Sequence, residues 1–61
     1  MEKLIAHCRQ KDTQVLVMAI QMLGGGDLAT EQTMARAAML EVYAERQGDE
    51  ACEALMDKIG L

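Results

Sequence analysis

The sequence predicts an all-α fold, a small bundle of three to four short helices in one domain over residues 1–61. Three observations support this prediction. The chain has no proline and is rich in alanine and methionine, which are good helix formers. Both ends of the chain carry apolar residues at the helical spacing i, i+3, i+4, i+7. Outside one central run, no β-branched segment is present from which a sheet could be built.

The first helix is expected over about residues 2–10. A single apolar stripe runs along it, at positions 1, 4, 5 and 8. Residues 11–14 are polar and form either a tight turn or a polar stretch within one longer helix. A turn is favoured, because Asp12 and Thr13 are helix-capping residue types and come directly before a hydrophobic run.

The second helix, expected over about residues 12–23, contains the most hydrophobic stretch of the chain, interrupted only by Gln21. Gly24 can end it, because glycine adopts the left-handed conformation without a steric penalty. At 100° per residue, Met18 lies at the edge of a broad apolar face and Val17 on the far side. A face this broad predicts contact with more than one other helix; its members are Val15, Leu16, Ala19, Ile20, Met22 and Leu23.

The third helix is expected over about residues 30–47, after a loop that begins with three glycines. Thr30 can cap this helix, and Asp27 is an alternative cap that would start it three residues earlier. Its main apolar face is formed by Met39, Leu40 and Tyr43.

The fourth helix is expected over about residues 49–59, between Gly48 and Gly60, with Asp49 as its cap. It has the cleanest helical stripe of the chain, at positions 52, 55, 56 and 59. The connections between the four helices are short, which favours helices that pack against their neighbours in the chain.

The length of the chain predicts a need for a partner. Sixty-one residues without Phe or Trp offer a small core, and domains this short are marginally stable alone. Small domains commonly gain stability from a disulfide, a metal or a second subunit. With two cysteines and one histidine, self-association is the favoured route.

The net charge of −4 is unevenly distributed and limits the partners that we expect. Residues 1–26 carry a net charge of +1, from three basic and two acidic residues, and residues 27–61 carry −5, from three basic and eight acidic residues. Nucleic acid is not expected as a partner, because phosphate binding requires Lys and Arg. A membrane is not expected either, because the central apolar run is shorter than the roughly 20 residues that span a bilayer. With no recognisable signal peptide, we expect a cytoplasmic protein.

No catalytic, cofactor-binding or metal-binding residues are predicted. The triglycine loop lacks the Lys-Ser/Thr of a phosphate-binding loop. His7, Cys8 and Cys52 are too few for a zinc site, and both cysteines lie on apolar stripes. The acidic residues have no nucleophile or histidine beside them, so an enzyme is not expected.

Two surfaces are candidates for binding. The first is an interface, since methionine suits adaptable contact surfaces; its residues are Val17, Met18, Met22, Met39 and Tyr43. The second is an acidic surface of Glu41, Glu45, Glu50 and Glu53.

The favoured function is a small non-enzymatic helical protein–protein interaction module that works as a homo-oligomer, with a second copy of the chain as its partner. The alternative is a small acidic inhibitor or regulator, whose partner is a basic protein surface such as that of a nucleic-acid enzyme. DNA binding of the helix-turn-helix kind is a weaker alternative. Its loop would be longer than that motif uses, and Arg36 and Arg46 lie among acidic residues.

Overall fold

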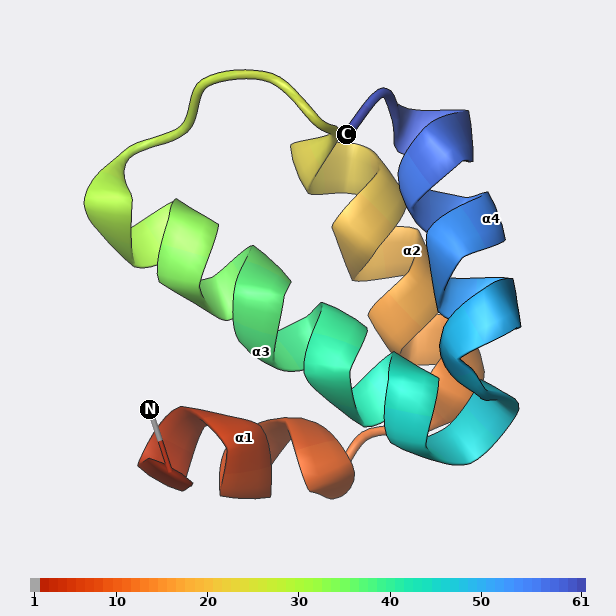
Figure 1. Ribbon diagram of the computed structural model, residues 1–61. Helices are drawn as coiled ribbons and strands as arrows, with labels where there is room; N and C mark the ends of the chain where they lie inside the picture. Colours follow the sequence, from red (N-terminus) through yellow and green to blue (C-terminus); the bar gives the residue numbers. More distant parts are fainter. Residues whose placement is uncertain (1) are drawn as a thin grey trace.

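The computed structural model describes residues 2–61, and these form four α-helices and no strand. The helices are α1 (Glu2–Arg9), α2 (Thr13–Leu23), α3 (Thr30–Gln47) and α4 (Asp49–Ile59), shown in Figure 1. The all-α fold class is therefore confirmed, and every helix end lies within one residue of its predicted position. Residues 10–12 form a turn between α1 and α2, so the polar stretch does not lie within one continuous helix.

α3 is the helix against which the other three pack. In Figure 1, α1 lies along one side of α3, whereas α2 and α4 lie on its other side. This arrangement explains why α3 is the longest helix, with 18 residues, and why it supplies four of the nine buried core residues. The chain is thus organised around α3, although α2 is the more hydrophobic helix.

The core combines side chains from all four helices. Leu16 and Ile20 of α2 are at most 1% exposed, and they belong to the same buried cluster as Val42 of α3, which is fully buried. α1 contributes Cys8, and α4 contributes Cys52 and Leu55; Ala38, Met39 and Leu40 complete the core from α3. Complete burial of an aliphatic side chain of this size is worth about 1.5–3 kcal/mol, so these residues provide the main driving force for folding.

Two predicted helix caps are wrong. Thr30 and Asp49 are the first helical residues, and the cap positions belong to Ala29 and Gly48. The side chain of Gln32 accepts a hydrogen bond from the backbone N–H of Ala29 at 3.3 Å, which satisfies one backbone donor at the start of α3. Asp49 remains favourable in the first turn of α4, because its carboxylate suits the positive end of the helix dipole.

Two arginines of α3 hold the two ends of α2. Arg46 donates from Nη1 to the carbonyl oxygen of Lys11 at 2.6 Å and from Nη2 to that of Arg9 at 2.7 Å, just before α2 begins. Arg36 donates from Nη1 to the carbonyl oxygen of Gly24 at 2.8 Å and to that of Gly26 at 3.2 Å, just after α2 ends. Because each guanidinium donates to backbone carbonyl groups of the segments that flank α2, the arginines tie both ends of α2 to α3.

The triglycine loop returns to the end of α4. The Cα of Gly25 lies so close to the backbone of Ile59 and Gly60 that no Cβ would fit there. Gly60 adopts the left-handed conformation (φ 89°, ψ 26°), and the N–H of Leu61 donates to the carbonyl oxygen of Met56 at 2.8 Å. The loop and the C-terminus therefore meet at one end of the molecule, as Figure 1 shows.

Candidate interaction surface

α2 exposes a stripe of large apolar side chains on the face that points away from the core. Val15 is 47% exposed, Met18 57% and Met22 87%. The three follow the spacing i, i+3, i+7, so they share one face of the helix. On the opposite side, Leu16 and Ile20 are buried against α3. We call Val15, Met18 and Met22 the α2 stripe.

The helix that carries the α2 stripe has no charged residue of its own. None of the eleven residues of α2 is charged, and its polar members are Thr13, Gln14 and Gln21. Depletion of charge and enrichment of methionine are features of the buried centre of protein–protein interfaces. The α2 stripe has this composition, whereas the chain as a whole has a net charge of −4.

A shallow groove of about 320 Å³ lies beside the stripe. α2 and α4 form its two sides, and Tyr43 of α3 lies between them. Its wall on α4 includes two alanines, Ala51 and Ala54, whose small side chains leave the groove open. One charged side chain lines it; the full lining is Val17, Gln21, Tyr43, Ala51, Ala54, Leu55 and Lys58.

The five predicted interface residues occupy three different environments. Met18 and Met22 belong to the exposed α2 stripe, and Val17 and Tyr43 are half-buried in the wall of the groove. Met39 is only 9% exposed and lies in the core. Met39 is therefore removed from the candidate interface, because the packing of the monomer already uses its side chain.

Val15 belongs to the stripe although the sequence places it on the buried face. Helical periodicity predicts Val15 and Met22 beside Leu16 on a broad face that contacts more than one helix. α2 packs mainly against α3, and the groove separates it from α4. The buried arc of α2 is consequently narrower than its apolar arc, and Val15 and Met22 stay in solvent.

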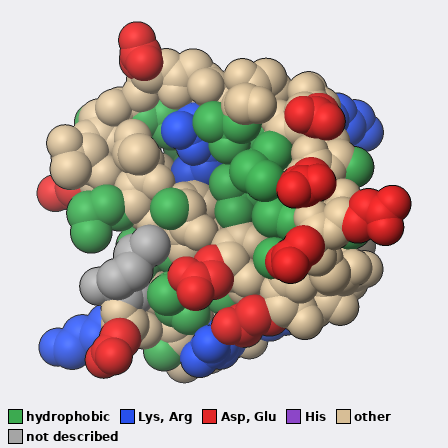
Figure 2. All heavy atoms as spheres, viewed as in Figure 1, with side chains coloured by type: hydrophobic (Ala, Val, Ile, Leu, Met, Phe, Trp, Pro, Cys, Tyr) green, Lys and Arg blue, Asp and Glu red, His purple; other side chains and the backbone are tan. Residues whose placement is uncertain are grey.

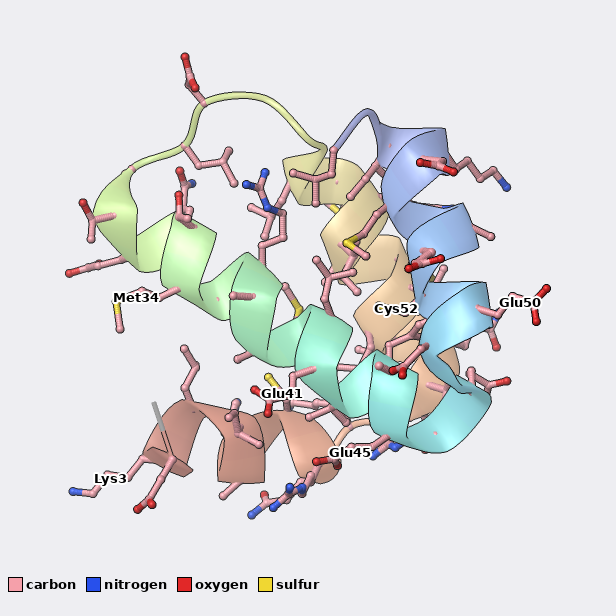
Figure 3. The ribbon with its side chains drawn as sticks, in the orientation of Figure 1. Lys3, Met34, Glu41, Glu45, Glu50 and Cys52 are labelled. Atoms are coloured by element: carbon pink, nitrogen blue, oxygen red, sulfur yellow. The ribbon has the colours of Figure 1, made fainter. Side chains whose placement is uncertain are left out.

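The four predicted acidic residues come from two helices, α3 and α4. In Figure 3, Glu41 and Glu45 lie on the side of α3 that faces α1, whereas Glu50 points outward from α4. Glu53 is also on α4 and exposed. In Figure 2, most of the acidic side chains on the visible face lie over its right-hand and lower part, with other side chains between them.

Glu45 is also engaged within the molecule. Its carboxylate accepts two hydrogen bonds from Arg9, at 2.7 Å from Nη2 and 3.2 Å from Nε. This pair is the one ion pair within residues 2–61, and it joins α1 to α3. The hydrogen bond from Arg9 lowers the pKa of Glu45, and the same bond raises the pKa of Arg9. Part of the predicted acidic surface thus serves the fold.

The two arginines that the DNA-binding alternative requires are also engaged in hydrogen bonds within the molecule. Arg36 and Arg46 both donate to backbone carbonyl groups beside α2. A side chain held in this way is less available to contact phosphate, because it would first have to leave these carbonyl oxygens.

Both cysteines are free and buried. Cys8 and Cys52 are each 5% exposed, and the thiol of Cys52 donates to the carbonyl oxygen of Leu40 at 3.4 Å. Burial raises the pKa of both thiols, so neither resembles a reactive thiolate. Within residues 2–61, no three His, Cys, Asp or Glu side chains gather closely enough to hold a metal ion.

Comparison with protein-family models, with curated proteins and with solved structures finds no match to this chain. Among residues 2–61, none of the helices combines the length and the apolar character that crossing a bilayer requires. The most distinctive feature of the described surface is the α2 stripe.

Proposed function

We propose that this chain is a small, non-enzymatic protein–protein interaction module that works as a homo-oligomer, in the simplest case a homodimer. The observation that carries the proposal is the α2 stripe of Val15, Met18 and Met22. Large apolar side chains that gather on a solvent-facing helix surface mark sites of association.

Met22 makes the case most clearly. At 87% exposed, its side chain contributes almost nothing to the packing of a single copy. Burial of a methionine side chain is worth about 1.5–3 kcal/mol, and that free energy is gained only when something covers it. Each copy in a symmetric dimer would contribute the same side chain, so the gain occurs twice.

The charge distribution supports a second copy as the partner. Two chains of net charge −4 repel each other, and the repulsion is smallest where the contacting surfaces carry no charge. α2 is the helix without a charged residue. A symmetric contact through α2 therefore brings two copies together without placing like charges opposite each other.

The proposal includes a cytoplasmic location. Cys8 and Cys52 are unpaired thiols in the core, the usual state of cysteine in a reducing compartment.

The experiment is a measurement of molar mass by light scattering during size-exclusion chromatography, in reductant, over a range of chain concentrations. We expect a mass that rises with concentration toward twice 6.7 kDa. Met22→Lys should weaken association by about tenfold or more, because a lysine would have to be desolvated in the contact. Met34→Lys is the matched control. Met34 is a 43% exposed methionine of α3 that points away from the other helices in Figure 3.

Two results would overturn the proposal. One is a wild-type chain that stays monomeric at every concentration while it unfolds cooperatively. The other is a dimer that Met22→Lys and Met34→Lys weaken equally, since association would then not involve the α2 stripe.

A further inference from the structure

We infer that the groove between α2 and α4 receives the α2 stripe of a second copy. The two-fold axis of this dimer runs parallel to α2 and lies between the two copies. This inference rests on the proposed function, since it specifies how the two copies meet. It assigns a role to Val17, Tyr43, Ala51 and Ala54, which line the groove.

The groove and the stripe lie on two adjoining sides of the same helix. Val17 and Gln21 face the groove, and each is followed directly by a stripe residue, Met18 and Met22. Successive residues of an α-helix are about 100° apart and rise by only about 1.5 Å. Each methionine therefore stands at almost the same height along α2 as the groove residue before it.

Symmetry then limits the ways in which two copies can meet. If the two-fold axis is perpendicular to α2, the α2 helices of the two copies are antiparallel, and stripe lies against stripe and groove against groove. If the axis is parallel to α2, the two α2 helices are parallel, and the stripe of each copy lies against the groove of the other. In the second case Met18 and Met22 arrive at the heights of Val17 and Gln21, where the groove is open.

The area that a dimer needs favours the second arrangement. A standard interface buries about 800 Å² on each partner. That is about a fifth of the 4163 Å² that one copy exposes. Three side chains on a convex helix cannot supply this area by touching three identical ones. Seating the methionines in the groove buries the stripe and the groove walls together, and it does so twice in each dimer.

The charges around the groove allow this contact. A parallel arrangement places identical residues of the two copies at the same height, which would oppose like charges on a charged helix. α2 has no charged residue, so this cost is absent along its length. Lys58 is the one charged residue in the groove lining. Its alkyl stem can lie against Met22 of the second copy while its ammonium group stays in water.

The test fills the groove. Ala54→Leu adds bulk to the α4 wall at an exposed position, so the fold should tolerate it. Ala37→Leu is the matched control, because it makes the same change at an exposed alanine of α3 that does not line the groove. We expect Ala54→Leu to weaken association by about tenfold or more and Ala37→Leu to leave it unchanged. Thermal unfolding followed by circular dichroism is the control that tests whether both variants are folded.

Mixing two variants gives a more stringent readout. A pair formed by one Met22→Lys chain and one Ala54→Leu chain keeps one intact contact, in which the native Met22 enters the native groove. Each variant alone keeps none. We therefore expect the mixture to contain heterodimers at a concentration where each variant alone is monomeric.

Disulfide trapping distinguishes the two arrangements directly. After mild oxidation, the inferred arrangement predicts a crosslink between a Met18→Cys chain and an Ala54→Cys chain. Stripe-on-stripe packing predicts that Met18→Cys chains crosslink to each other. The inference is overturned if Ala54→Leu dimerises like the wild type, or if only the second crosslink forms. In both cases a dimer sensitive to Met22→Lys would leave the proposed function standing. A wild-type chain that never dimerises overturns both.

Discussion

Replacing Gly25 with alanine should destabilise the fold, because the loop backbone has no room for a side chain there. A Cβ built on Gly25 would lie 2.6 Å from the carbonyl oxygen of Ile59 and 2.7 Å from the carbonyl carbon of Gly60. Both are backbone atoms at the end of α4, and they cannot rotate away as the end of a flexible side chain could. The loop must therefore separate from α4 to accommodate the methyl group.

The expected loss follows from this geometry. Overpacking at a closely packed site costs about 1–3 kcal/mol. In a domain of 60–100 residues, each 1 kcal/mol shifts the melting temperature by about 4–8 °C. Gly25→Ala should therefore lower the melting temperature by about 4–24 °C, the upper end applying if α4 is displaced.

Gly26→Ala provides the control at the next position. Its Cβ would meet no atom within 4 Å, and its φ does not lie in the left-handed region. At such a site, alanine reduces the freedom of the unfolded chain and stabilises by about 0.4–1 kcal/mol. Thermal and urea unfolding followed by circular dichroism should thus separate the two variants clearly. Equal melting temperatures for Gly25→Ala and Gly26→Ala would refute the close contact between the loop and α4.

Three further predictions concern the contacts of α1 and the core. Arg46→Ala should destabilise the fold by about 1 kcal/mol, because the carbonyl groups before α2 lose their hydrogen-bond donor. This loss lowers the melting temperature by roughly 4–8 °C. Arg46→Lys should restore only part of the lost melting temperature. Because Arg9 lowers the pKa of Glu45, the ion pair stabilises the fold fully above the ordinary glutamate value of about 4.3 and less as the pH falls through the lowered pKa. Glu45→Gln should therefore make the melting temperature depend less on pH below about pH 4.3. An unchanged pH dependence would contradict the ion pair between Arg9 and Glu45. Cys8 and Cys52 should react with a thiol reagent only as fast as the chain unfolds, whereas rapid labelling of either in the native protein would contradict their burial.

The helices could be predicted from the sequence because their signals are local. Glycines at 24, 48 and 60 follow the last helical residues, and the apolar spacing in α1 and α4 repeats with the helical period. Even so, the predicted caps at Thr30 and Asp49 lie one residue too late, because Ala29 and Gly48 occupy the cap positions.

The faces of α2 could not be predicted fully, because periodicity gives the width of an apolar arc and not the number of helices that cover it. α2 has one close neighbour, so Val15 and Met22 remain exposed beside the buried Leu16. For the same reason Met39, on the central helix, is buried and not at a surface.

The contacts of Arg36 and Arg46 with backbone carbonyl groups could not be predicted from the sequence either. Arg36 reaches carbonyl groups 10 and 12 residues away, and Arg46 reaches groups 33 to 37 residues away. No local pattern marks such contacts, which depend on how α2 and α3 pack. The groove beside α4 has no sequence signal either, since its walls come from three helices.

The central claim is that the α2 stripe is covered by a second copy of the chain. The most direct test is the molar mass of the wild type and of Met22→Lys in reductant, from low to high micromolar concentration. The claim predicts a wild-type mass that approaches twice 6.7 kDa and a Met22→Lys mass that stays near 6.7 kDa at the same concentrations. A folded wild-type chain that remains at 6.7 kDa throughout would contradict it.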